Sequence, residues 1–229
     1  MSPENGATPH RDYEVDDGGD GSTSIHFAAL GIDRHHRPAA ERLWREFREE
    51  LAVDRRLLIP TSVALHAVEL AGPRGRFHRS RSSSPEFHRR HTQEVVLRGL
   101  RVIATFPGVR VHAVHRETTD YARDRPALFA ALAHDLNAEL AGDGTYGRLI
   151  VDGDGREAAL RGAHRTLPPE GRYLVGDPVF EPAPTRDLLQ AADFLAYAAY
   201  QAVARKEPRR FMWDWFAETF PDADGPRAR

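Results

Sequence analysis

A helical segment near the C-terminus constrains the fold more than any other part of the chain. Residues 187–206, DLLQAADFLAYAAYQAVARK, are apolar or small on nearly every helical face, so we expect this helix to be buried on all sides. Its interior carries one carboxylate, Asp193, and a buried carboxylate needs a partner because taking its charge out of water is costly. That partner is either an arginine or a divalent metal ion shared with other acids.

The composition is that of an ordinary globular protein. The chain has 229 residues, of which 41% are hydrophobic and 29% charged, so it can bury a sizeable core. No window approaches the ~18 uninterrupted apolar residues of a membrane span, and the polar N-terminus does not look like a signal peptide, so we expect a cytoplasmic protein with no membrane partner. Because cysteine is absent, disulfides, thiolate zinc sites and iron–sulfur clusters are excluded.

Hydrophobic periodicity predicts alternating strands and helices. Segments 13–16 and 24–32 flank a Gly/Asp turn and are expected to form a β-hairpin. Further predicted strands are the short runs 57–59 and 63–65, then 109–115, 148–152 and 173–180. The predicted helices are 38–51, 86–106, 126–140, 156–166 and 187–206, the last opened by a capping box of Asp187 and Gln190.

This order of elements indicates one α/β domain with a mixed sheet. Residues 1–11 are interpreted as a disordered leader, and residues 12–206 as the domain. Residues 207–229 contain the aromatic run FMWDWFAETF and are expected to pack back on the domain. The aromatic side chains could also stack on bases, but their helical spacing favours packing.

Four motifs occur in the order YEVDDGGD, LHAVEL, LIVD and LLQAADFLAYA. On these motifs the chain resembles the proteins grouped as domain of unknown function 3800, which are similar to ribonuclease H-like nucleases and integrases. The resemblance covers about residues 12–206, and LQ-x-AD-x-x-AY is its most specific part. It implies a ribonuclease H-like fold, a mixed sheet flanked by helices, with a carboxylate metal site but no particular substrate.

The resemblance also implies which residues form that site. The matching positions are Asp16 on the first strand, His66 and Glu69 in the HA-x-E segment, Asp152 at the end of a later strand, and Asp193 on the final helix. The family usually has Asp-Glu-Ser-Gly after its first strand, whereas this chain has Asp-Asp-Gly-Gly, so Asp17 stands in the place of the glutamate.

Separated carboxylates that meet in the fold suit two-metal phosphodiester hydrolysis. Oxygen ligands favour Mg²⁺ or Mn²⁺ over zinc, so we predict two such ions as cofactors. Asp154 and Asp177 are rival ligands to Asp152. The predicted metal ligands are Asp16, Asp17, Asp152, Asp193 and Glu69, of which all but Asp17 are predicted to be catalytic, with His66 and Gln190 beside them.

Each of these residues also has a purely structural explanation. Asp and Gly dominate tight turns, so Asp16 could be a turn residue. Asp193 could pair with a buried arginine, or form a polar network with Gln190 and Tyr197 on the same helical face. Glu69 could be an ordinary surface acid. The chain contains twelve histidines, so His66 could be a core histidine.

An arginine-rich segment, GRFHRSRSSSPEFHRR, precedes the second long helix. Guanidinium groups neutralise phosphates well, so the segment suits DNA or RNA backbone binding. The alternative is a solvated loop, because all but one of the 32 basic residues of this chain are arginine wherever they occur. The candidate nucleic-acid contacts are Arg74, Arg76, Arg79, Arg81, Arg89 and Arg90.

The sequence therefore predicts a Mg²⁺- or Mn²⁺-dependent nuclease acting on a phosphodiester backbone. One rival hypothesis is a catalytically silent module that keeps the fold to bind nucleic acid or a protein. In that case the acids would be scattered or bridged by arginines. A third hypothesis is a hydrolase of a small phosphorylated molecule, which would need a closed pocket.

Overall fold

A six-stranded mixed sheet forms the centre of the computed structural model, which describes residues 10–72 and 85–229. The strand order is β5-β4-β1-β2-β3-β6, and β2 alone runs antiparallel to its neighbours. The predicted α/β class, a mixed sheet flanked by helices, is confirmed. The strands are β1 (Arg11–Gly19), β2 (Ser24–Asp33), β3 (Arg110–Glu117), β4 (Gly147–Asp152), β5 (Val179–Glu181) and β6 (Asp224–Ala228).

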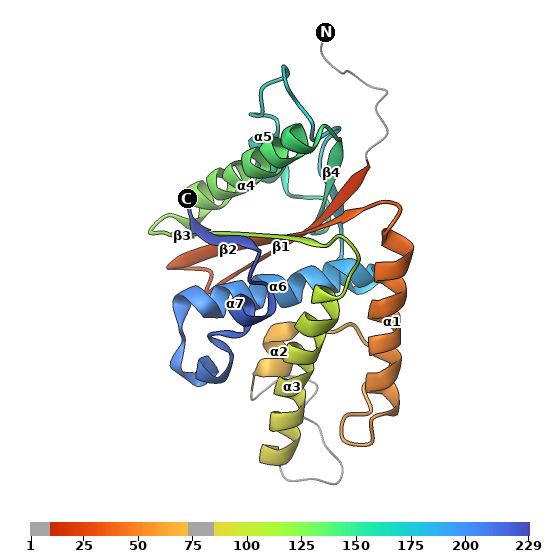
Figure 1. The fold of residues 1–229 in the computed structure, drawn as a ribbon. Helices are drawn as coiled ribbons and strands as arrows, with labels where there is room; N and C mark the ends of the chain where they lie inside the picture. Colours follow the sequence, from red (N-terminus) through yellow and green to blue (C-terminus); the bar gives the residue numbers. More distant parts are fainter. Residues whose placement is uncertain (1–9, 73–84) are drawn as a thin grey trace.

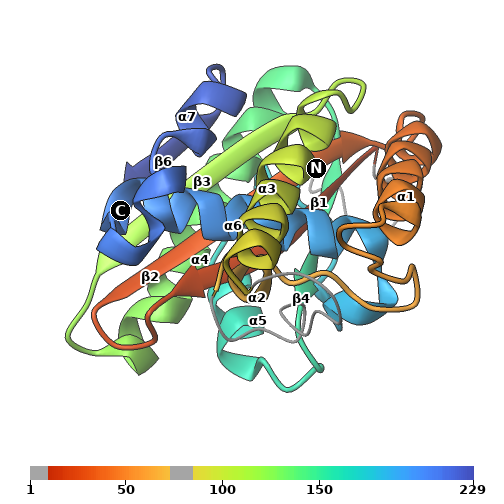
Figure 2. The same ribbon diagram turned by 90° about the horizontal axis from the view of Figure 1, so that it is seen from below.

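Helices cover both faces of this sheet (Figure 1). One face carries α4 (Tyr121–Asp143) and α5 (Ala158–His164). On the opposite face α6 runs directly against the strands, and Figure 2 shows α3 crossing over it, with α1 to one side. The elements on that face are α1 (Arg37–Val53), α2 (Ala67–Ala71), α3 (Pro85–Ala104), α6 (Asp187–Ala204), α7 (Trp215–Thr219), and the 3₁₀ turns η2 (Ala183–Thr185) and η3 (Glu207–Met212).

The alternation of side chains along β1 separates two cores. Tyr13 and Val15 are fully buried in the core beneath α4 and α5. The alternate residues Asp12, Glu14 and Asp16 point to the α6 face because strand side chains alternate. Their β2 partners Ile32, Leu30 and Ala28 belong to the core that contains α1, α3 and α6. The strand therefore places a row of three buried acids under α6.

The prediction that the 187–206 helix is buried on all sides is confirmed for residues 188–201, whereas residues 202–206 are partly buried or exposed. Every residue of α6 from Leu188 to Gln201 is buried except Asp193, whose side chain is 14% exposed. Small residues let the helix approach the sheet closely. A Cβ atom on Gly18 of β1 would lie only 3.3 Å from the Ala196 carbonyl oxygen. This close approach brings Asp193 near the end of β1.

Several predicted boundaries are wrong. Residues 57–59 and 63–65 form turns and irregular structure, and residues 173–180 supply only the start of the short β5 and one bridge between Leu174 and Gly147. The capping box is absent because Arg186 precedes α6 without a side-chain cap bond. The predicted leader ends too late, because the buried Arg11 begins β1. Residues 1–9 lie outside the described residues.

The aromatic tail packs on the domain as expected and also extends the sheet. Met212, Phe216 and Phe220 are buried in the core around α6. Beyond them, β6 pairs in parallel with β3 at the sheet edge. The segment DGPRA has no apolar alternation, so periodicity gave no signal for this strand.

Close packing of α3 against α6 predicts an unusual response to a helix-favouring substitution. Ala is ordinarily preferred over Gly in a helix by about 1 kcal/mol. At Gly99 of α3, however, a Cβ atom would lie 2.5 Å from the fully buried Phe194 ring. We expect Gly99→Ala to lower the free energy of unfolding by about 1–3 kcal/mol, measured by urea denaturation.

Gly162→Ala in α5 is the matched control, because nothing lies within 4 Å of its added Cβ. That variant should be unchanged or more stable by up to about 1 kcal/mol. Equal stabilisation by both substitutions would show that α3 and α6 are not in close contact.

Candidate active site

Four of the five predicted acids line one cavity, and three of them, Asp16, Asp152 and Asp193, have no arginine partner in the described residues. The β1–β4 register pairs Val15 with Val151, and continuing it by one residue places Asp152 beside Asp16. Asp193 reaches the same place from α6. All three line a cavity of about 370 Å³ together with His66 and Ala183. The structure therefore brings together acids that are up to 177 positions apart, since 193 − 16 = 177.

Backbone N–H groups hold these carboxylates. The Ala67 N–H, at the start of α2, donates to Asp193 Oδ2 at 2.6 Å. The Ala183 N–H of η2 donates to Asp152 Oδ1 at 2.6 Å, and the Asp17 N–H donates to Asp16 Oδ1 at 2.8 Å. Each of the three acids thus accepts a hydrogen bond from a main-chain N–H group that orients it.

The three carboxylates repel one another across the cavity. Burial raises the pKa of Asp16 well above its ordinary value, and the negative charges of Asp193, Asp17 and Asp152 raise it further. Burial also raises the pKa of Asp193 to about 6 and the pKa of Asp152. None of these three pairs with an arginine or lysine in residues 10–72 and 85–229. Acids perturbed by burial and by like charges are typical of functional sites.

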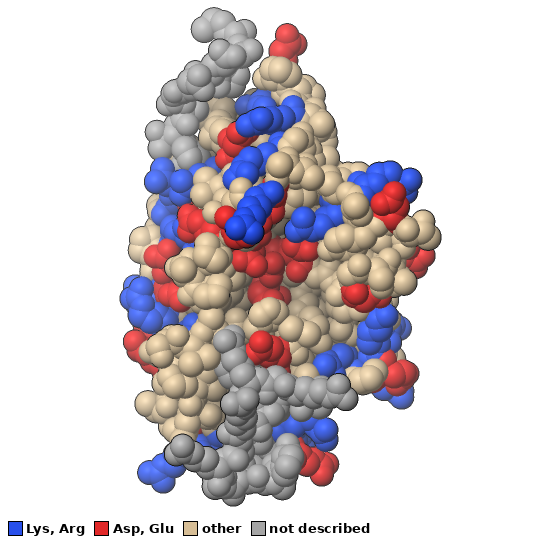
Figure 3. Space-filling view, turned by 180° about the vertical axis from the view of Figure 1, so that it is seen from behind, with Lys and Arg blue, Asp and Glu red and all other residues tan. Residues whose placement is uncertain are grey.

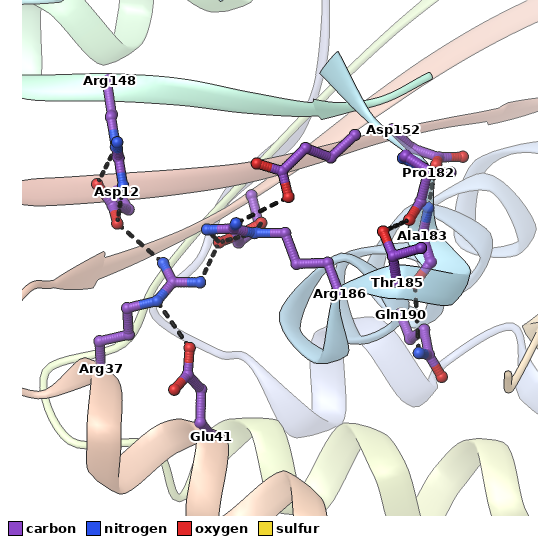
Figure 4. A network of polar contacts seen from close by, with 12 residues as sticks. Asp12, Arg37, Glu41, Arg148, Asp152, Pro182, Ala183, Thr185, Arg186 and Gln190 are labelled. Carbon is purple, nitrogen blue, oxygen red and sulfur yellow. Dashed lines mark hydrogen bonds and ion pairs between the residues drawn. The ribbon is translucent and has the colours of Figure 1, made fainter. Parts of the chain in front are cut away.

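The other two acids on the same face of β1 are fully neutralised (Figure 4). Asp12 accepts hydrogen bonds from Arg148 at 2.7 Å and Arg37 at 2.9 Å. Glu14 accepts from Arg37 and from Arg186, the residue that precedes α6. These buried pairs fix the start of α6 against β1 and β4. We call Asp12, Glu14, Arg37, Arg148 and Arg186 the arginine network. Along β1 it ends at Glu14, two residues before Asp16.

Gln190 connects two walls of the cavity to α6. Its Oε1 accepts hydrogen bonds from the Leu65 N–H at 2.9 Å and from Arg48 at 2.7 Å, while its Nε2 donates to the Ala183 carbonyl. The buried Arg48 also donates to the carbonyls of Thr61 and Val63. Gln190 therefore links the segments that carry Leu65 and Ala183, and Arg48 holds it; the sequence did not mark Arg48 because it lies on an amphipathic helix among many arginines.

The remaining predicted site residues occupy different places. His66 is half-exposed, and its Nδ1 lies 3.5 Å from Asp193 Oδ1. Glu69 lies in α2, and its charge is among those that raise the pKa of Asp193. Asp17 lines the cavity, but its carboxylate is held by Arg125 of α4 at 2.8 Å. A carboxylate already paired in this way is a poorer metal ligand than Asp16.

Arg89 and Arg90 are the two predicted phosphate contacts that the structure describes. Both are exposed and lie in the first half of α3, so they belong to a helix and not to a loop. The other four, Arg74, Arg76, Arg79 and Arg81, lie outside the described residues. Figure 3 shows acidic side chains gathered near the centre of one face of the molecule, with Lys and Arg side chains around them.

The site offers oxygen ligands, the type that hard divalent cations prefer. Asp16, Asp152 and Asp193 offer carboxylate oxygens, the ligands that Mg²⁺ and Mn²⁺ prefer. Within the described part of the chain, no group of three or more His, Asp and Glu side chains is arranged so that it could hold a metal ion. Asp152 and Asp193 are instead turned toward the N–H groups of Ala183 and Ala67.

Comparisons with known proteins add little to this geometry. No family model matches the chain, and no curated protein matches it either. Among solved structures, a chain of the PCNA:RNase HII complex from Archaeoglobus fulgidus is similar over 94% of this chain and 81% of that chain. The TM-score is 0.37 and the identity 14%, a likeness too weak to carry an argument about activity. In the described residues no helix has the length and apolar character needed to cross a membrane.

The raised pKa of Asp193 predicts how its removal changes stability with pH. In the folded protein this pKa is about 6 against an ordinary value of 3.8, so the fold disfavours the charged form and loses stability as pH rises through this interval. In buffer with a chelator, Asp193→Asn should therefore raise the free energy of unfolding at pH 8 by about 1–3 kcal/mol. The gain should vanish near pH 4, as measured by urea denaturation at both pH values.

Asp12→Asn is the matched control, the same substitution on the buried acid face of β1. Asp12 is 1% exposed and paired with Arg37 and Arg148, so the substitution removes a charged partner from two partly buried cations. We expect it to destabilise the protein by about 3 kcal/mol at pH 8. Destabilisation by Asp193→Asn at pH 8 would instead assign Asp193 a structural role.

Proposed function

We propose that the chain is a metal-dependent nuclease that hydrolyses phosphodiester bonds at the cavity formed by Asp16, Asp152 and Asp193. The observation that carries this proposal is the contrast along one face of β1. Asp12 and Glu14 are neutralised by arginines, whereas Asp16 is buried beside two further acids without a cationic partner among the described residues. A buried group of like charges is expensive unless a cation compensates it.

The carboxylate oxygens of the cavity are the kind of ligand that would suit a pair of Mg²⁺ or Mn²⁺ ions. Asp16, Asp152 and Asp193 would hold them, with Glu69 next in reach on α2. Ions bound there would supply a water nucleophile at neutral pH and stabilise the charge on the leaving oxygen. Rigid supports suit this role, because a strand, a strand end and a buried helix hold their acids with little freedom.

Neighbouring residues would position the ligands and not react themselves. His66 and the Ala67 N–H orient the Asp193 carboxylate from one side. Gln190 joins Leu65 and Ala183, so it keeps the two cavity walls at a fixed separation. Loss of such outer contacts typically weakens metal affinity or activity by about 10–100-fold. The exposed Arg89 and Arg90 on α3 are available to bind the phosphates of a polyanionic substrate.

The alternative function, a silent binding module, makes a different structural demand. In such a module the acids would be bridged by arginines and serve only to hold the fold together. That description applies to Asp12, Glu14 and Asp17, whereas Asp16, Asp152 and Asp193 have no arginine partner in the described residues. The nuclease is therefore the better supported proposal.

The test is cleavage of labelled DNA and RNA, single-stranded and duplex, in Mg²⁺, Mn²⁺ or EDTA. The wild-type protein should cut at least one substrate in Mg²⁺ or Mn²⁺ and none in EDTA. Asp16→Asn and Asp193→Asn should each lower the rate by at least about 100-fold while remaining folded, because each removes a ligand charge.

Asp154→Asn is the matched control for this assay. Asp154 follows β4 by two residues, and its side chain is 62% exposed, so its loss should leave the rate unchanged. Full activity in Asp16→Asn would contradict the mechanism. Nucleic-acid binding without cleavage under any of these ions would favour the silent module.

A further inference from the structure

A second cavity lies beside the carboxylate cavity and shares part of its wall. Its volume is about 420 Å³, within the range of roughly 300–1,000 Å³ that is common for small-ligand sites. Asp17, His66 and Asp193 line both cavities. A ligand with one group at the carboxylates would therefore place its neighbouring group in this second cavity.

Aromatic rings form much of the second cavity. Tyr197 and Tyr200 of α6 line it, with ring centroids 6.4 Å apart and ring planes inclined by 50°. Gly18 and Gly19 at the end of β1 also line the cavity and add no side chains to it. Two inclined rings suit a flat ligand with apolar faces, since aromatic side chains stack on any planar ring.

A buried amide side chain in the same cavity has an unused acceptor, so the ligand should carry a hydrogen-bond donor at its edge. Gln201 is 2% exposed, lines the cavity, and its Oε1 has no hydrogen-bond partner among the described residues. Leaving a buried acceptor unsatisfied costs about 1–3 kcal/mol, so such groups need an explanation. An amide is also the side chain that reads the hydrogen-bonding edge of a nucleobase.

Two cations complete the cavity wall. Lys206 is about half-exposed, and its Nζ lies 3.4 Å from Asp20 Oδ2. Arg209 donates to the Tyr197 hydroxyl at 2.7 Å, which fixes the position of that ring. Cations beside an aromatic cavity suit a ligand that joins a flat ring to an anionic backbone.

We propose that this second cavity, the nucleotide pocket, binds the base of an unpaired nucleotide next to the phosphate held at the carboxylates. The substrate class is then single-stranded nucleic acid or an unpaired strand end. In a duplex, base pairing already uses the hydrogen-bonding edge of the base that would contact Gln201. A duplex would therefore have to unpair and unstack the base before it could enter the pocket. The placement of the phosphate rests on the proposed nuclease function, whereas base binding in the pocket can be measured without cleavage.

The test is equilibrium binding of a fluorescein-labelled oligonucleotide, single-stranded or annealed to its complement, by fluorescence anisotropy in EDTA. Wild type should bind the single strand at least about tenfold more tightly than the duplex, because flipping a paired base costs a few kcal/mol. Gln201→Leu should weaken single-strand binding about tenfold with little effect on the duplex. Thermal melting checks that this variant folds.

A second variant fills the pocket without touching the core. Val68 lines the pocket and is 43% exposed, so Val68→Trp should block the base and weaken single-strand binding about tenfold or more. Arg55→Gln, an exposed charge on the α1–α2 connection, controls for general loss of positive charge and should leave the single-strand preference intact.

The possible results separate this proposal from the nuclease proposal. Equal binding of single strand and duplex, or unchanged binding in both Gln201→Leu and Val68→Trp, would overturn the pocket even if Asp16→Asn abolishes cleavage. Conversely, loss of single-strand binding in these two variants supports the pocket even if no condition gives cleavage. In that case only the nuclease proposal fails.

Discussion

The pairing of buried acids with arginines along one face of β1 positions both α6 and the acidic cavity. Asp12, Glu14 and Asp16 all point beneath α6, where an unpaired carboxylate is expensive. Arginines from α1, β4 and the start of α6 neutralise the first two and thereby fasten those elements to the strand. Asp16 has no such partner in the described residues and meets two more acids instead. The same strand thus supplies both the anchor of the fold and an unbalanced acidic cavity.

The helix α6 connects this anchor to the cavity and to the nucleotide pocket. Its small residues allow close contact with the sheet at Gly18, which brings Asp193 to the end of β1. One turn earlier Gln190 holds the cavity walls, and two turns later Gln201 lies in the nucleotide pocket. The buried part of α6 therefore carries three polar side chains at the two cavities. Asp193 lines both, Gln190 holds the walls of the first, and Gln201 lines the second.

Sequence reasoning found the acids but not their surroundings. Asp16, Asp152 and Asp193 were recognisable because strand ends, a helix with one interior acid and the ordered motifs all leave local signals. The roles of Arg37 and Arg186 depend on partners far away in the sequence, and in an arginine-rich chain no local pattern marks which guanidinium is buried. β6 was missed because DGPRA carries no apolar alternation, and the nucleotide pocket because α6 reads as uniform core. These features follow only from tertiary contacts.

We propose that Asp16, Asp152 and Asp193, which lack a cationic partner in the described residues, bind divalent cations. Crystals soaked in Mn²⁺ can show this, because anomalous scattering locates the ion without any assay of activity. We expect an anomalous peak coordinated by Asp16, Asp152 and Asp193. A crystal saturated with Mn²⁺ that shows no peak there, or an arginine lying across these carboxylates, would contradict it.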